Sequence, residues 1–275
     1  WTPGDATSSV VVVACDRWEG VNAAGVDVDF DGRSWPVAVI HGGSQNWIDT
    51  GGNVTGSNYR FDFNAHEVGH NLTRDFGFNH AFGPGGPYFN RFCVMSAMQY
   101  ADDNSVVFDK WTPGSTRRPE ETTKGPGLAG CTRAGCGWAR VLRLQPHQLA
   151  DGVEVELTHL GDTATTLPEV IEWTVRTASG LSTYTLELRS PLVEWDQALS
   201  PSLVLCQRQG SRWASDRFWA PLSSTYVAHS AVAAGSAASL TSPGLVEAQM
   251  LDVTTRPGAK GAIPSAVRLR LTSPA

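Results

Sequence analysis

The sequence has few charged side chains, and it lacks the segments that mark membrane or nucleic-acid proteins. Charged residues make up 17% of the 275 positions, and the formal net charge is only −6. No basic block is present, which argues against a nucleic-acid partner. No apolar run approaches the ~20 residues of a membrane-spanning helix. The sequence contains no internal repeat. Its length is enough for one large domain or two ordinary ones.

Cysteine is scarce and odd in number. The five cysteines are Cys15, Cys93, Cys131, Cys136 and Cys206. An odd count leaves at least one thiol unpaired or paired outside the chain. Cys131 and Cys136 lie in a glycine-bearing stretch that we interpret as a loop, where a short disulfide is feasible. We therefore expect an oxidising compartment.

The most informative stretch is residues 63–98, and His66-Glu67-Val68-Gly69-His70 lies at its centre. Two histidines four positions apart on a helix share one face, with Cβ atoms roughly 5–6 Å apart. Both imidazoles can then reach one ion at the ~2.0–2.1 Å of zinc–nitrogen bonds. Glu67 is rotated about 100° round the helix, so it is placed to touch a water on that ion instead of the ion itself. The spacing predicts a zinc site with a general base.

The residues after the motif extend this pattern. Gly77 lets the chain turn out of the helix, His80 follows three positions later, and a methionine comes further on. The arrangement resembles the metzincin clan, in which His-Glu-x-x-His-x-x-Gly-x-x-His is followed by a Met-turn. Within that clan it looks most like the secreted proteases related to gametolysin and immune inhibitor A. The resemblance implies zinc ligands at His66, His70 and His80, a general base at Glu67, and a Met-turn methionine at Met95.

The chain departs from the family pattern before the third histidine. Gly77 comes seven positions after His70, which is four more than in the family. Apolar side chains keep helical spacing as far as Phe76, so we expect one extra helical turn there. His80 must then fold back by about 5.4 Å, the pitch of that turn, to reach the metal. Asp75 is the alternative, carboxylate ligand.

Several features near the motif allow alternatives. Met98 is the alternative Met-turn residue, because Tyr100 follows it by two positions as in some metzincins. Tyr88 and Tyr100 are candidate cleft residues that would donate a hydrogen bond to the tetrahedral intermediate. Residues 37–47 are our candidate for a strand that pairs with substrate, with a core strand at 37–40 as the alternative. Residues 102–104 offer oxygen ligands for Ca²⁺, although an EF-hand spacing is absent.

We predict an α+β fold in two domains. Residues 1–147 would form a zincin-like (metzincin) catalytic domain with strands near 10–14 and 35–41. Its active-site helix would begin near Ser57 or Asn58. Residues 148–275 would form a C-terminal all-β, sandwich-like domain, since short strand-like runs replace helical patterns there. These runs are residues 153–157, 169–175, 184–189, 203–206 and 267–271.

The sequence thus predicts a zinc-dependent endopeptidase. Three neutral imidazoles leave an open position on zinc and lower the pKa of a bound water towards ~7. Glu67 takes the proton as this water attacks the scissile carbonyl, and returns it to the leaving amine. One alternative is a protease directed at glycoproteins, with the β domain as reader. Another is a catalytically silent zincin-fold module that binds glycoprotein, although the intact Glu67 argues against it.

Partners and location follow from the same interpretation. We expect one catalytic Zn²⁺, a protein or glycoprotein substrate, no nucleic acid, no membrane span and a monomer. The chain opens at Trp1 without a basic or apolar leader, so we expect a mature or trimmed form. Secretion is implied by the resemblance.

Overall fold

Strands predominate in the part of the chain that the structure describes. The computed structural model describes residues 9–13, 22–30, 33–41, 45–48, 54–58, 69, 78, 80–83, 86–87, 90, 92–96, 126–177, 180–196, 199–209, 223–235, 239–242, 245–258 and 261–273. The α-helices that lie wholly within these residues are short, α2 (Gly130–Cys136) and α3 (Pro146–Asp151), and a 3₁₀ turn, η5 (Glu194–Asp196), follows later in the chain. None of the helices within these ranges is both long and apolar enough to span a bilayer.

The N-terminal strands form two small sheets. The three-stranded sheet has the order β1-β3-β2, and the other is an antiparallel pair of β4 and β5. Their bounds are β1 (Ser9–Val13), β2 (Asn22–Phe30), β3 (Arg33–His41), β4 (Gln45–Ile48) and β5 (Val54–Asn58). The strands predicted near residues 10–14 and 35–41 are therefore confirmed.

Two expectations for this region are corrected. β3 pairs with β1 on one edge and with β2 on the other, so residues 37–40 offer no edge to a substrate strand. They form the alternative, an inner strand, while the rest of the candidate stretch, up to residue 47, stays a prediction. Ser57 and Asn58 belong to β5 and pair with β4, so they do not start a helix.

The largest sheet among the described residues has seven strands in the order β7-β6-β13-β12-β11-β10-β8. Most neighbours are antiparallel, whereas β8 runs parallel to β10 and β6 parallel to β13. The strand bounds are β6 (Phe82–Gly83), β7 (Gly86–Pro87), β8 (Val141–Leu144), β10 (Val170–Thr177), β11 (Gly180–Arg189), β12 (Ser202–Gln209) and β13 (Ser223–Ala231). Residues as early as Phe82 thus share a sheet with strands near the C-terminus.

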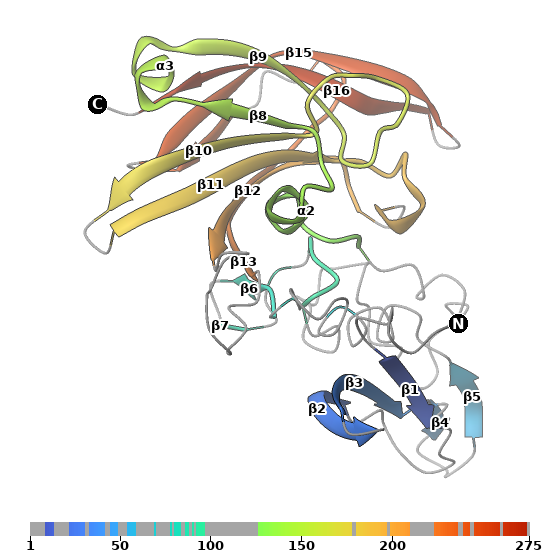
Figure 1. Cartoon of the computed structure of the whole chain (residues 1–275). Coiled ribbons are helices and arrows are strands. Elements are labelled where there is room, and N and C mark those ends of the chain that lie inside the picture. Colours follow the sequence, from blue (N-terminus) through green and yellow to red (C-terminus); the bar gives the residue numbers. More distant parts are fainter. Residues whose placement is uncertain are drawn as a thin grey trace.

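A four-stranded sheet covers one face of the seven-stranded sheet (Figure 1). Its order is β14-β15-β16-β9, and its strands are β9 (Val153–Thr158), β14 (Ser239–Ser242), β15 (Val246–Gly258) and β16 (Gly261–Thr272). Alternation explains β16: Val267, Leu269 and Leu271 are buried, while Arg268 and Arg270 between them are exposed. The exposed arginines face Glu156 and Glu154 of β9 in register, and such opposite-charge pairs stabilise a sheet surface.

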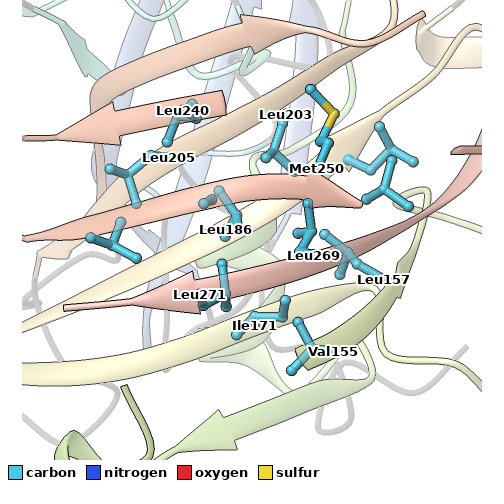
Figure 2. Packing of buried hydrophobic residues seen from close by; sticks show 14 of the residues in the cluster. Val155, Leu157, Ile171, Leu186, Leu203, Leu205, Leu240, Met250, Leu269 and Leu271 are labelled. Atoms are coloured by element: carbon cyan, nitrogen blue, oxygen red, sulfur yellow. The ribbon is translucent and has the colours of Figure 1, made fainter. Parts of the chain in front are cut away.

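The space between the two sheets is filled mainly by aliphatic side chains (Figure 2), together with Trp173 and Tyr184. Leu186, Leu203 and Leu205 come from the seven-stranded sheet, and Leu269 and Leu271 from the four-stranded sheet. All five are fully buried. At about 1.5–3 kcal/mol per fully buried side chain, this layer is the main source of stability in the sandwich.

The opposite face of the seven-stranded sheet is also covered. α2 packs on β10, β11 and β12, as Figure 1 shows. The second hydrophobic cluster lies there, and it joins Val204 and Cys206 of β12 to residues far away in sequence, among them Phe78, Phe92 and Met95. The central strands are consequently buried on both sides.

The predicted fold class is wrong. Strands predominate in the described residues, and they do not divide into a helix-bearing zincin domain and a separate β module. The reason is pairing: β8 and the β6–β7 hairpin, all before residue 147, complete the same sheet as β10–β13. The strands predicted after Pro146 do lie at the expected positions. The domain boundary at residue 147 stays a prediction.

Candidate functional site

Gly69 is the one residue of the His66–His70 motif that the structure describes. Its backbone is helical and it is buried. The N–H of Phe78 donates to the carbonyl oxygen of Gly69 over 2.9 Å, although nine positions separate the two residues. The chain that follows the motif therefore lies against it by residue 78.

A tight turn at residues 92–96, the Met95 turn, packs on the same glycine. Its N–H···O bond runs from Ser96 to the carbonyl of Cys93 over 3.0 Å. Met95 is 1% exposed, and a Cβ at Gly69 would overlap its sulfur and lie 3.2 Å from its methyl carbon. Only glycine lets the backbone of the motif approach the thioether so closely.

His80 lies on a segment that is fixed at both ends. Two positions before it, Phe78 is bonded to Gly69, and one position after it, the Ala81 N–H donates to the Met95 carbonyl over 2.8 Å. Phe78 and Ala81 are buried, whereas His80 is partly exposed. Gly69, the residues Phe78 and Ala81 that flank His80, and the Met95 turn are thus in contact.

Asn90 and Ser96 hold the Met95 turn in shape. The Asn90 N–H donates to Ser96 Oγ over 2.9 Å, and Asn90 Oδ1 accepts from the Phe92 N–H over 3.0 Å. The amide of Asn90 also donates to Ser224 Oγ in β13 over 3.2 Å. Since both Asn90 and Ser96 are buried, these bonds replace hydration that the turn has lost.

A buried ion cluster of Glu187, Arg189 and Asp196 lies directly behind the turn. Arg189 is 0% exposed and forms two bonds to Asp196, from Nη2 to Oδ1 over 2.5 Å and from Nε to Oδ2 over 2.7 Å. Its Nη1 donates to Glu187 Oε1 over 3.1 Å and to the Phe92 carbonyl over 2.6 Å. The cluster therefore connects β11 to the Met95 turn.

The electrostatics of this cluster follow from its burial. Burial disfavours the charged guanidinium, but Asp196 and Glu187 outweigh that effect and raise the pKa of Arg189. Burial also raises the pKa of Glu187, against the opposing influence of Arg189 and of the Gly130 N–H. A Cβ on Gly130 would overlap the Glu187 carboxylate, so glycine is required where α2 begins.

The thiols on this face are buried and correct the disulfide expectation. No disulfide joins the described cysteines. Cys131 and Cys136 lie on helix α2, not in a loop, and five positions on a helix turn about 500°, which directs their side chains to different sides. Burial raises the pKa of Cys93 to about 11. The pKa of Cys206 is raised, mainly by its hydrogen bond with Cys131 and next by its burial.

The described residues do not contain a metal-binding group either. Within them, no cluster of three or more His, Cys, Asp or Glu side chains is arranged to hold an ion, which corrects the metal-binding expectation for this part of the chain. Of the predicted ligands, His80 alone belongs to the described residues. The remaining candidates lie outside them: His66, Glu67, His70, Asp75, Tyr88, Met98, Tyr100 and residues 102–104.

Sequence reasoning missed the residues that support the turn. Glu187 and Arg189 alternate with leucines in β11, a pattern that is typical of a solvent-facing side, yet both are fully buried. Asn90 carried no signal in the sequence. One clue was available: an acidic and a basic residue on the same face of a central strand need partners wherever that face is covered.

Comparison with known proteins gives no match: no family model, no curated protein and no solved structure is similar to this chain. The function of this chain must therefore be inferred from its own residues.

Proposed function

We propose that this chain is a zinc-dependent endopeptidase that hydrolyses peptide bonds in proteins or glycoproteins. His66, His70 and His80 would hold the zinc ion, Glu67 would be the general base, and Met95 would be the methionine beneath the site. We keep the chemistry that the motif implies, but not the zincin fold that the resemblance implied. Secretion and a monomeric state belong to the same proposal, on the resemblance alone.

One observation supports this proposal most. The sulfur of Met95 packs against Gly69, the residue between Glu67 and His70, and the segment that carries His80 is bonded to both Gly69 and Met95. The resemblance to metzincins implies a returning histidine and a methionine under the motif. A chance motif on a surface helix would require neither contact.

The donor set suits zinc. Imidazole nitrogens are common zinc ligands, and three of them leave one coordination position open. When bound, the ion would polarise the scissile carbonyl and make a bound water acidic near neutral pH. Gly69 within the motif suits a closely packed site, because a larger residue there would displace the Met95 side chain.

The chain's own residues supply proton transfer and support. The Glu67 carboxylate takes a proton from the attacking water and later delivers it to the leaving amine. Met95 contacts the backbone of the motif and so limits its movement. The bonds from Phe78 and Ala81 fix the approach of the His80 segment.

The test compares the wild-type protein with Glu67→Gln. Purified protein is assayed for zinc content by mass spectrometry and for casein hydrolysis with and without a chelator. We expect one zinc per chain in both proteins, and a loss of activity in Glu67→Gln of about 10²–10⁴-fold, the usual contribution of a general base. Near-normal hydrolysis by Glu67→Gln would refute the mechanism. Wild-type protein that binds zinc without hydrolysing casein or a glycoprotein would point to the silent module.

A further inference from the structure

The Met95 turn is held by the neighbouring sheet through a charged contact. Nη1 of Arg189 donates to the Phe92 carbonyl over 2.6 Å, and both residues are buried. Charge-assisted bonds of this kind are about twice as strong as neutral ones. Water cannot substitute for the guanidinium, because Arg189 is 0% exposed.

A second route leads from the same arginine to the turn. Arg189 fixes Asp196 through two bonds, and Asp196 Oδ1 accepts the N–H of Gly127 over 3.1 Å. The Gly127 carbonyl in turn accepts the N–H of Val94 over 3.2 Å. Phe92 and Val94 are thus both tied to the cluster, and Met95 comes directly after Val94.

The rings around Phe92 add to this attachment. Phe92 stacks on Tyr226 with centroids 5.9 Å apart, and its ring lies 5.3 Å from that of His229. Both partners belong to β13. These contacts hold the ring of Phe92, whereas the bond from Arg189 holds its backbone carbonyl.

We propose that Arg189 is a positioning residue for the proposed zinc site. It acts through Phe92 and Val94 on Met95, whose sulfur supports Gly69 between Glu67 and His70. The planar guanidinium is required because it reaches two carboxylates and a carbonyl at once, which a lysine ammonium cannot do in the same geometry. The catalytic meaning of this role rests on the proposed function.

The experiment uses Arg189→Lys in the full chain, with Arg208→Lys as the matched control. Arg208 forms an ion pair with Glu172 over 2.8 Å on the same face of the sheet, but it has no bond to the turn. Each protein is first checked for native circular dichroism. The methyl resonances of its three methionines are then recorded after ¹³C labelling, with Met95 assigned from Met95→Leu.

We expect the Met95 methyl resonance to move in Arg189→Lys and to stay in place in Arg208→Lys. Affinity for cobalt, measured from its visible absorption, should fall about 10–100-fold in Arg189→Lys, the range for residues that support metal ligands. kcat should fall with KM nearly unchanged. A folded Arg189→Lys protein with wild-type methyl resonances and cobalt affinity would overturn the inference.

A second variant covers the case in which Arg189→Lys does not fold. Asp196→Asn keeps an acceptor for the Gly127 N–H but removes one charge. The Met95 methyl resonance should therefore move less than in Arg189→Lys. An unchanged spectrum in Asp196→Asn would equally overturn the inference. The two proposals fail separately: wild-type protein that binds neither zinc nor cobalt refutes the proposed function, while the methyl resonances still decide whether Arg189 positions the turn.

Discussion

Two ion clusters on one face of the seven-stranded sheet show how the surroundings change the role of a charge. The buried ion cluster has one arginine between two carboxylates, Glu187 and Asp196, and all three side chains are at most 2% exposed. The peripheral ion cluster has one carboxylate, Glu172, between Arg143 and Arg208. The arginine side chains there are 64% and 23% exposed.

The registers place both clusters on the same side of the strands. Glu172 is opposite Thr185, which lies two positions from Glu187 on β11, and Arg143 and Arg208 follow the same alternation. Of the two clusters, only the buried one bonds to backbone atoms outside the sheet, at Phe92 and Gly127 in irregular segments and at Gly130 where α2 begins. A charge that water can reach adds little, whereas a dehydrated one fixes the position of chain that has no secondary structure of its own.

The largest effect is expected from Arg189→Met. This change leaves two buried carboxylates without their cation, and removing one partner of a buried pair costs about 3–5 kcal/mol of unfolding free energy. Urea unfolding followed by tryptophan fluorescence measures it. A loss below about 1 kcal/mol would remove the distinction between the two clusters.

The free energy of unfolding should fall at alkaline pH because of the thiols on the buried face. The pKa of Cys93 is about 11 in the folded protein and 9.0 in an exposed thiol. Between these values the unfolded chain releases a proton that the folded chain retains, so this contribution is complete below pH 9 and falls as pH rises. This difference in the pKa of Cys93 corresponds to about 3 kcal/mol of unfolding free energy.

Urea unfolding at pH 8, 9, 10 and 11 checks this expectation. Cys93→Ala should show a shallower decline over the same range, with the remainder due to Cys206, whose pKa is also raised. Equal slopes in Cys93→Ala and wild type would contradict the assignment to Cys93.

Gly69→Ala tests the contact that the buried cluster supports. The added methyl overlaps the Met95 sulfur, and overpacking of this kind costs about 1–3 kcal/mol. The double variant Gly69→Ala/Met95→Ala should show an interaction energy, because the smaller side chain leaves room for the methyl. Additive effects in that cycle would show that the two residues do not touch.

The smallest effect is expected from Arg208→Met. Its guanidinium is partly exposed, and Arg143 stays beside Glu172 to balance the charge. Ion pairs in such surroundings contribute about 0–1 kcal/mol, and salt should reduce even that. Thermal unfolding at low and at high salt measures it. A loss as large as that in Arg189→Met would reverse the comparison.

Regular alternation allowed strands to be predicted from the sequence. In β9 and β16 one side is buried and the other faces solvent, so apolar and charged residues alternate as expected. The same logic located β11, but it gave no sign that Glu187 and Arg189 are buried. Periodicity records which residues share a face, and it contains no information on what covers that face later in folding.

The fold class could not be obtained in this way because it depends on distant pairings. Nothing local in residues 82–83 indicates a partner in β13, and nothing in residues 141–144 indicates that they join β10. The stretch around Cys131 was interpreted as a loop because of its glycines, yet Gly130 begins helix α2 there. At the candidate site, the family resemblance implied a methionine near the motif, whereas the support of its turn comes from Arg189, 97 positions after Phe92.

The pairing of Phe82 with Thr225 also sets an order of assembly. These partners are 143 positions apart, so the loop between them must close before the contact stabilises anything. During synthesis from the N-terminus, the motif and the Met95 turn emerge long before β13 and Arg189 exist. A growing chain therefore carries the proposed catalytic residues without the scaffold that aligns them. A protease built in this way would gain its activity only after most of its length had been made, which would protect the cell that synthesises it.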